Sequence, residues 1–351
     1  MDRAMSEEKI AGADIVVIVV TYNSQAMFAR QAAALRAQTT QGFRLVVWDN
    51  ASAPDQRPLA ADFPEGADIV LSPDNLGFAA GNNRAAERAP EARFIVLLNP
   101  DAFPEPTWLE ELLRAAAAHP EAACFGSTQI DGADPAVFDG LGDAYHALGV
   151  GWRGGHGQQG HAPVSGETFS ACAAAMLVRG DAWRAAGGFD ERFFSYGEDL
   201  DLGFRLRLMG HAVRQVAPAR VAHMGGASAP RRSDFAVYYG RRNRLWLFVK
   251  NMPAPVFWLM APAHAFFTAA LWLNALARND TATLRALADA LRGLPEIWRR
   301  RRAVQAVRTA SVFAIVQALA WSPWAPLSRC PIIWNRPPPG SRAHVQGARS
   351  L

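Results

Sequence analysis

A carboxylate that could hold a metal ion stands at the end of an apolar segment in the first third of the chain. Asp101 closes the sequence Leu97-Leu98-Asn99-Pro100-Asp101, and its charge cannot turn back into an apolar core without a partner. Mg²⁺ and Mn²⁺ typically bind through one or two carboxylates together with substrate phosphates, so Asp101 is placed to supply one ligand. Taken alone, however, an Asn-Pro-Asp segment is explained better by an ordinary turn.

A second acidic group could move a proton. Glu198, Asp199 and Asp201 follow the aromatic stretch at residues 193–196, at the start of an expected helix. The helix dipole favours acids in a first turn, but three carboxylates within four residues exceed what capping needs. One of them, buried against aromatic rings, could have a pKa suited to proton abstraction. His223 follows a later apolar run, and a lone histidine is more often structural than a ligand.

Glycines and polar residues at other strand ends could bind a nucleotide. Gly77 and Gly81 lie in residues 75–83 and permit close backbone approach at a helix start, where a diphosphate would be stabilised. A helix start capped by asparagines is the alternative. Tyr22, Asn23 and Asp49 could face a base or ribose, although turns also favour these residue types. No G-x-G-x-x-G motif occurs near the first strand, which weighs against a nicotinamide or flavin enzyme.

The elements that must position these residues are predicted from the pattern between residues 15 and 129. Short β-branched runs alternate with Ala-rich helical stretches, which is typical of buried parallel strands joined by crossover helices. The sequence therefore predicts an α/β fold with a mostly parallel, Rossmann-like sheet flanked by helices. Its strand ends converge on one crevice. The predicted strands are residues 15–20, 43–48, 68–71 and 94–98.

The pattern changes after this region. Residues 131–166 are rich in glycine, histidine and aspartate and show no sustained period, so we expect a long surface excursion that serves as a lid or acceptor loop. Order returns with an apolar run at 172–178 and an amphipathic helix at about 200–209. A helix at 238–250 is expected to close the domain.

Composition and charge exclude several classes of protein. The chain has 351 residues, of which 50% are hydrophobic, so it can bury a large core with an appendage or form two domains. A net charge of +4 comes with an arginine cluster at 299–302 but no nucleic-acid-binding module, so we expect no nucleic acid partner. Three scattered cysteines argue against a disulfide framework or zinc site and favour a reducing cytoplasm. The first apolar run is too short for a signal peptide.

The C-terminal third has the composition of a membrane-associated segment. Residues 251–277 contain no Asp, Glu, Lys or Arg and are long enough to span a bilayer, but we expect Pro253, Pro255 and Pro262 to break the first part. A basic amphipathic stretch at 284–302 follows. We therefore expect shallow insertion at the cytoplasmic face of the membrane, the alternative being a soluble helical cap. Residues 336–351, with three consecutive prolines, are predicted to be disordered.

Taken together, these segments resemble the family 2 glycosyltransferases with a GT-A fold, which include bacterial rhamnosyltransferases of polysaccharide biosynthesis. The resemblance covers residues 15–250, with each block in order. It implies an inverting, metal-dependent enzyme that uses Mg²⁺ or Mn²⁺. Its donor would be a nucleotide diphosphate sugar and its acceptor a glycan or lipid-linked molecule. A non-catalytic sugar-nucleotide-binding protein and a sugar nucleotidyltransferase are the alternatives.

The resemblance also implies roles for individual residues. Asp199 matches the catalytic base, and Asp101 with His223 matches the metal site, although Asn99 stands where the metal motif usually has its first Asp. Asp101 and Asp199 should therefore face each other across one cleft. Residues implied on the acceptor side are Asp190, Tyr196, Glu198 and Arg242. Residues implied in donor binding are Thr21, Tyr22, Asn23, Asp49, Asn75, Gly77, Phe78, Gly81, Asn82, Asn99 and Asp101.

The expected domain organisation follows from the same blocks. An N-terminal tail at 1–14 precedes the GT-A domain at 15–250, which divides into a nucleotide-sugar half at 15–129 and an acceptor and catalytic half at 130–250. Residues 251–335 form the helical extension with membrane contact.

Overall fold

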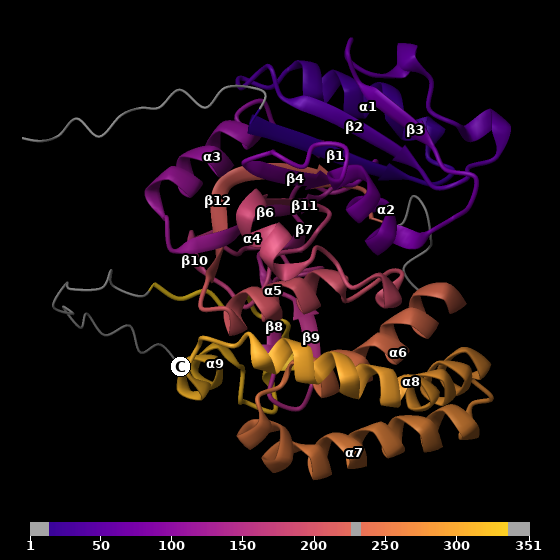
Figure 1. The fold of residues 1–351 in the computed structure, drawn as a ribbon, viewed down its shortest axis with the longest axis vertical. Helices are drawn as coiled ribbons and strands as arrows, with labels where there is room; N and C mark the ends of the chain where they lie inside the picture. Colours follow the sequence, from indigo (N-terminus) through magenta and orange to yellow (C-terminus); the bar gives the residue numbers. More distant parts are fainter. Residues whose placement is uncertain (1–13, 226–232, 336–351) are drawn as a thin grey trace, which may run out of the picture.

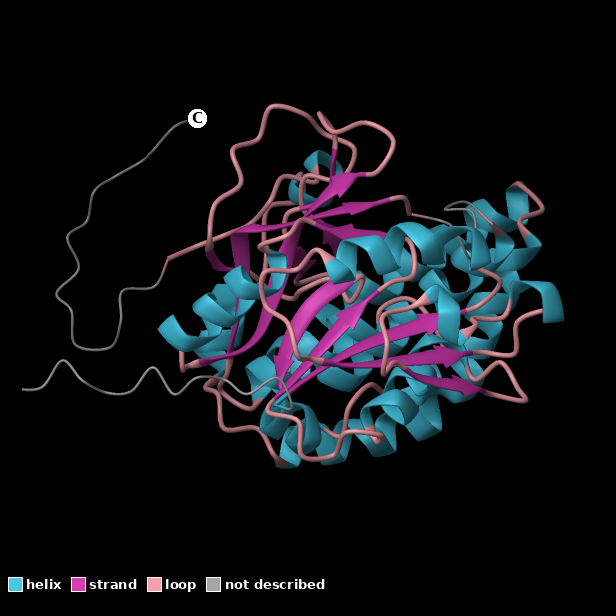
Figure 2. Ribbon diagram, turned by 90° about the horizontal axis from the view of Figure 1, so that it is seen from above, coloured by secondary structure: helices cyan, strands magenta, loops and turns pink. Residues whose placement is uncertain are grey.

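The computed structural model describes residues 14–225 and 233–335. A ten-stranded sheet crosses its centre, and helices cover both of its faces (Figures 1 and 2). The predicted α/β class is confirmed. The N-terminal tail and the predicted disordered segment at 336–351 lie outside the described residues, apart from residue 14.

The first half of the sheet is parallel, as the pattern predicted. Strands β1, β2, β3 and β4 pair in the spatial order β4-β1-β2-β3. Each lies within one residue of its predicted bounds at both ends. The elements of this half are β1 (Ile15–Thr21), α1 (Gln25–Arg36), β2 (Arg44–Asp49), β3 (Asp68–Leu71), α2 (Gly77–Ala86) and β4 (Phe94–Leu98), with short 3-10 turns at Pro54–Gln56 and Ala60–Asp62.

The second half makes the sheet mixed, although a mostly parallel sheet was expected. Strand β11 runs antiparallel between β4 and β6, while β12 is parallel to β6. The elements here are β5 (Ala102–Pro104), α3 (Trp108–Ala118), β6 (Ala122–Asp131), β7 (Phe138–Gly140), β8 (Asp143–His146), β9 (Val150–Arg153), β10 (Gly166–Glu167), β11 (Ala175–Arg179), α4 (Gly180–Ala186), a 3-10 turn at Glu191–Phe193, α5 (Glu198–Leu208) and β12 (Ala212–His223).

Alternation along the strands divides the core into two layers. In β1, Val17 and Val19 belong to the layer covered by α1 and α3, while Val16 and Ile18 belong to the layer covered by α2, α4 and α5. Successive side chains of a strand point to opposite faces, so a strand covered on both faces must be apolar throughout. This explains the continuous apolar run that predicted β1.

The prediction of a surface excursion at 131–166 is wrong. The segment contains β7, β8 and β9, and Asp139, Asp143 and Tyr145 are buried. The strands are only three or four residues long, too short for a recognisable period. Glycine allows the close packing: Gly142 has φ +82° and lies against the side chain of Thr168.

Helix α5 is also less amphipathic than expected. It begins at Glu198, and every residue from Asp201 to Leu208 is buried. Two arginines can be buried because their guanidinium groups are paired: Arg205 donates to Asp201, and Arg207 donates to the carbonyl of Phe169.

The C-terminal helices form a separate layer that packs on α5 and the β8–β9 hairpin (Figure 1). The prediction that prolines break residues 251–277 is wrong, because α7 is one continuous helix. Pro253 and Pro255 stand at its start, where a missing N–H is not needed, and Pro262 lies inside it. The helices are α6 (Asp234–Asn251), α7 (Ala254–Ala277), α8 (Thr281–Ala306), α9 (Val312–Ala318) and α10 (Ala325–Ser328).

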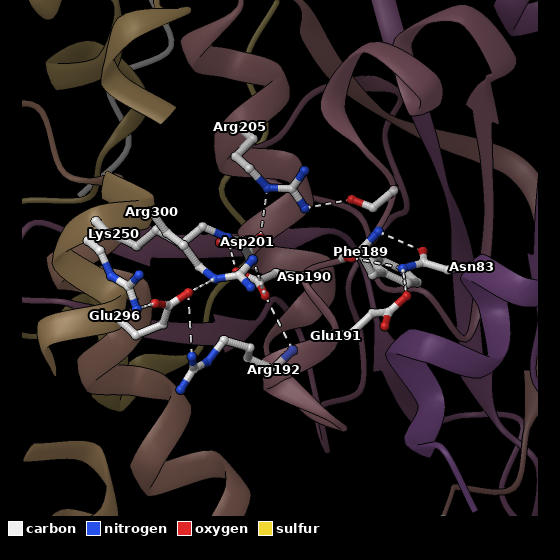
Figure 3. Close-up of polar contacts among 12 residues, drawn as sticks. Asn83, Phe189, Asp190, Glu191, Arg192, Asp201, Arg205, Lys250, Glu296 and Arg300 are labelled. Atoms are coloured by element: carbon white, nitrogen blue, oxygen red, sulfur yellow. Dashed lines mark hydrogen bonds and ion pairs between the residues drawn. The ribbon is translucent and has the colours of Figure 1, made fainter. Parts of the chain in front are cut away.

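A buried ion-pair cluster links helices α6 and α8 to residues 190–201, the segment that contains the three neighbouring acids predicted from the sequence (Figure 3). The ammonium of Lys250 in α6 lies 2.7 Å from Asp190 Oδ2 and 2.8 Å from Asp201 Oδ1. Arg300 of α8 reaches Asp190 at 3.2 Å, and Arg205 donates to Asp201 at 2.7 Å. Burial opposes ionisation of Asp201, but Arg205 and Lys250 lower its pKa to about 2. Residues 190–201 are therefore held at both ends.

We expect Lys250→Met to lower the free energy of unfolding by about 3–5 kcal/mol, because two buried carboxylates lose their shared cation. Urea denaturation followed by circular dichroism measures the change. Arg292→Gln is the control, since it breaks an exposed pair with Asp289 within α8 and should change stability by less than about 0.5 kcal/mol. Equal effects of the two substitutions would contradict a special role for the buried cluster.

Candidate active site

Asp101 and His223 meet where strands β5 and β12 pair. His223 is the last residue of β12 and is opposite Ala102 of β5, so both side chains emerge at the same place. Both are buried, and His223 Nε2 lies 3.3 Å from Asp101 Oδ1. The side-chain nitrogen of Asn99 lies 3.4 Å from the same His223 atom. The residues that matched a metal site are therefore in direct contact.

This pair fits a divalent ion. Adjacent ligands of an octahedral Mg²⁺, with bonds of about 2.1 Å, lie about 3.0 Å apart. The separation of 3.3 Å between Nε2 and Oδ1 is close to this value. Asn99 Oδ1, which is buried close by, has no hydrogen-bond partner among the described residues. The chain thus offers oxygen and imidazole ligands on one side of a site.

Asp139 fixes the orientation of the His223 ring. His223 Nδ1 lies 2.7 Å from Asp139 Oδ2 and donates to it, so Nε2 faces Asp101, where it would carry either a proton or a metal ion. Arg153 donates to the same carboxylate at 2.5 Å. Burial opposes ionisation, yet Arg153, His156 and His223 hold the pKa of Asp139 far below its usual range. Asp139 is thus a permanent anion behind the histidine.

A proton on His223 would compete with a bound metal ion. Burial works against its charge, but hydrogen bonds to Asp101 and Asp139 raise the pKa of His223. A metal ion would replace that proton. Within residues 14–225 and 233–335, no group of three or more His, Cys, Asp or Glu side chains has a metal-binding arrangement. Asp139 faces the other ring nitrogen, so two protein ligands remain, and a diphosphate and water would complete the shell.

The three acids at 198–201 have different environments. Burial raises the pKa of Asp199, whose carboxylate accepts hydrogen bonds from the backbone of Leu200 at 2.8 Å and Ala173 at 3.3 Å. Burial and the neighbouring charge of Asp199 raise the pKa of Glu198 well above its usual range. Glu198 Oε2 has no hydrogen-bond partner among the described residues. Asp201 is committed to the ion-pair cluster, so Asp199 and Glu198 are left as proton acceptors.

Arg153 connects the acidic group with the histidine. It is bonded to Asp139, and its positive charge counteracts the effect of burial on Asp199. Neither Asp139 nor Arg153 was singled out in the sequence, because both lie in the segment that looked like a surface excursion. The length of the apolar runs gave no sign of them. Their burial is visible only once β7 and β9 are placed.

The loop before the acidic group has a strained backbone. Phe194 and Tyr196 have φ of 63° and 68°, which side chains other than glycine rarely adopt. Asn243 of α6 holds the loop by donating to the carbonyls of Phe193, Ser195 and Tyr196 at 2.6–2.9 Å. Such strain persists only where the surroundings enforce it, and here α6 does so.

Among the residues matched to the acceptor side, two are engaged in the fold. Arg242 donates to the carbonyls of Arg192 and Phe193, and the carboxylate of Asp190 binds Lys250. Tyr196 is 38% exposed and precedes Glu198 closely, so its ring is available to a ligand.

Several residues matched to the donor site also have structural partners. Gly77 begins α2 with φ +82°, and a Cβ there would lie 2.5 Å from the ring of Phe194. Gly81 packs on Val20 and Trp48, which brings α2 close to the sheet. The donor segment and the strained loop are thus in contact.

The remaining donor residues lie at strand ends or on α2. Phe78 packs against Phe189, Asn82 donates to the Phe78 carbonyl, and Asn75 accepts from the amide of Gly77. Asp49 is buried and accepts two hydrogen bonds from Ser52, which stabilises the turn after β2.

The first strand end offers polar groups of its own. Tyr22 is 39% exposed, and Asn23 has φ 51°. Thr21 Oγ1 is buried without a hydrogen-bond partner among the described residues. Asn23 Oδ1 already accepts a hydrogen bond from the amide of Ala53 at 2.9 Å, so Tyr22 and Thr21 are the members of this set whose polar groups best suit a bound nucleoside.

Comparison with known proteins identifies the domain. Residues 16–178 match the model of the family described as glycosyl transferase family 2. This segment is a glycosyltransferase family 2 domain. The resemblance inferred from the motifs is confirmed. The family 2 domain contains Asp101 and Asp139, whereas Asp199 and His223 lie beyond the matched residues.

Two curated relatives have names from O-antigen biosynthesis and rhamnosyl transfer. The chain is 30% identical over 200 residues to the O-antigen biosynthesis protein RfbC of Myxococcus xanthus, covering 54% of this chain and 15% of that protein. It is 28% identical over 230 residues to an N-acetylglucosaminyl-diphospho-decaprenol L-rhamnosyltransferase of Mycobacterium tuberculosis, covering 59% and 75%. The chain thus spans a small part of the first relative and three quarters of the second.

A solved structure shows the same architecture. GalNAc-T7, crystallised with UDP, GalNAc and Mn²⁺, aligns with a TM-score of 0.54 and 12% identity over 67% of this chain and 47% of that one. The GT-A fold expected from the sequence is confirmed.

We expect Asp139→Asn to weaken Mn²⁺ binding by about 10- to 100-fold, because His223 loses the charged partner that orients it. Titration followed by electron paramagnetic resonance of free Mn²⁺ measures the affinity without any turnover. Asp134→Asn, an exposed acid in the same segment, is the control and should bind like the wild type. A wild-type affinity for Asp139→Asn would remove Asp139 from this role.

Proposed function

We propose that the protein is an inverting, metal-dependent glycosyltransferase that moves a sugar, with rhamnose as the leading candidate, from a nucleotide diphosphate donor to a lipid-linked glycan. The names of its relatives support polysaccharide assembly and a rhamnosyl donor. The observation that carries the proposal is the pairing of Asp101 with His223, together with Arg153, which binds the His223 partner Asp139 and whose charge also acts on the carboxylate of Asp199.

The proposed reaction uses two sets of residues. Asp199 accepts the proton of an acceptor hydroxyl as that oxygen attacks the anomeric carbon, while the bond from this carbon to the nucleotide diphosphate breaks. Asp101 and His223 would hold the divalent ion, which neutralises the charge of the departing diphosphate. Attack from the face opposite the leaving group inverts the configuration at the anomeric carbon.

Asp199 needs an elevated basicity for this role. A carboxylate with an ordinary pKa is a weak base, and burial moves the pKa of Asp199 toward that of the proton it must accept. Since the base must be ionised, kcat/KM should fall as the pH drops through this raised pKa. The acid limb of the profile should therefore lie above the usual range of an aspartate.

We expect Asp199→Asn to lower kcat by about 10²- to 10⁴-fold, because the amide cannot take the proton. Donor binding measured by calorimetry should stay within about twofold of the wild type. Glu198→Gln is the matched comparison, since it removes the neighbouring buried acid but leaves the assigned base. Loss of turnover in Glu198→Gln with full activity in Asp199→Asn would assign the base to Glu198 instead.

The proposal includes contact with the cytoplasmic face of the membrane through α7. One side of this helix packs into the protein through Val256, Phe257 and His264. Of the described helices, only α7 is long and apolar enough to cross a membrane, with a mean hydropathy of 1.5 over its most apolar window. Because α7 lies lengthwise along α8, an in-plane insertion suits it better than a span (Figure 1).

The outward side of α7 is apolar. Leu259, Phe266 and Leu273, each seven residues apart, are 71%, 78% and 63% exposed. Arg299 and Arg302 are exposed on the neighbouring helix α8, where they would attract anionic lipid.

We expect Phe266→Asp to reduce binding to vesicles of phosphatidylethanolamine and phosphatidylglycerol by about tenfold, because a ring that inserts is replaced by a charge. Flotation of the protein with the vesicles measures the bound fraction. Leu59→Asp, which changes a leucine that is 64% exposed in the N-terminal half, should bind normally. Equal binding of both variants would argue against α7 as the docking helix.

A further inference from the structure

A cavity lies between strand β9 and the C-terminal segment around α10. Its volume is about 320 Å³, within the range of small-molecule sites. Three basic side chains line it, those of Arg153, His156 and Arg329, together with Trp152 and Pro326. No acidic side chain is among the described residues that form its wall. Arg153 and His156 are already paired with Asp139 behind the wall, so among the described residues Arg329 is the basic group left for a bound anion.

The cavity is built by bringing distant parts of the chain together. The amide of Gly155 donates to the carbonyl of Arg329 at 2.7 Å, and Trp152 Nε1 donates to the carbonyl of Cys330 at 3.3 Å. The side chain of Gln158 donates to the Ser328 carbonyl at 2.5 Å. These bonds fix the backbone at residues 328–330, and this places Arg329 in the cavity wall.

The cavity adjoins the proposed base. Gly151 forms part of its wall, and a Cβ at this residue would lie 2.5 Å from the side chain of Leu200, the neighbour of Asp199. Arg153 lines the cavity and also bonds Asp139, the partner of His223. The cavity wall therefore contacts the residue next to Asp199 and includes the arginine that binds Asp139.

The outer side of the cavity is apolar. Pro326 of α10 lines it, and the neighbouring Trp324 and Leu327 are 72% and 75% exposed. The hydrocarbon chain of a lipid could be buried against such a surface, whereas a water-soluble anion makes no apolar contact there. Basic groups inside and exposed apolar groups outside match an amphiphilic anion.

We propose that this cavity binds the diphosphate of an isoprenoid-diphosphate-linked acceptor, with Arg329 on the phosphates and the lipid chain leaving over Trp324 and Leu327. Because it names the acceptor, this inference rests on the proposed function. It adds a site that the family match does not reach, since Arg329 lies far beyond residue 178. Guanidinium groups suit this task because they bind phosphate oxygens in a planar, bidentate way.

The test is calorimetry of the full chain with farnesyl diphosphate, without donor and with a chelator that removes divalent ions. Arg329→Gln should weaken binding by about tenfold or more, because a charge-assisted contact to phosphate is lost. Arg329→Lys, which keeps the charge, should recover part of the affinity. Arg114→Gln, an exposed arginine on α3, is the control and should bind like the wild type. Thermal melting checks that every variant is folded.

Two further probes separate the possible ligands. Farnesol lacks the phosphates and should bind weakly, and inorganic pyrophosphate lacks the chain and should bind more weakly than farnesyl diphosphate. Equal affinities for pyrophosphate and farnesyl diphosphate would overturn the lipid part of the proposal. Unchanged binding in Arg329→Gln would overturn the site. Because no donor is present, these results are independent of whether Asp199→Asn or the donor assays support glycosyl transfer.

Discussion

The buried carboxylate of Asp139 is the interaction around which the site is arranged. An aspartate with no exposed surface can stay ionised only if its surroundings compensate for the lost water, and Arg153, His156 and His223 do so. Each of these groups comes from a different turn or strand end. Once Asp139 is an anion, the orientation of the His223 ring and the position of Arg153 follow.

A second buried cluster holds the loop at residues 193–196 and the acidic residues that follow it. Lys250 and Arg205 neutralise Asp190 and Asp201, while Asn243 satisfies three carbonyls of a loop with two residues in left-handed conformations. This second cluster draws on helices outside the matched family domain. The C-terminal helices are thus part of the machinery that shapes the site, because α6 and α8 carry side chains that the loop cannot do without.

The sequence predicted the first half of the fold well, because a strand buried on both faces must be continuously apolar and such runs are easy to recognise. It failed at residues 131–166, where short strands alternate with glycine turns and leave no period. Asp101 and His223 could be named from the motif that they match, and the structure puts them in contact. Asp139, Arg153 and Arg329 could not be found this way, since their importance comes from burial and from contacts between distant segments. The predicted break at the start of α7 was wrong for a different reason, because a helix tolerates proline in its first turn.

The outward face of α7 has a consequence for handling the protein in solution. Its apolar side chains repeat every seven residues and are left exposed by the residues that the structure describes. In plain buffer the same surface on another copy is the nearest apolar partner, so samples should associate reversibly as their concentration rises. Mild detergent or lipid nanodiscs would compete for that surface, and monodisperse preparations should depend on them.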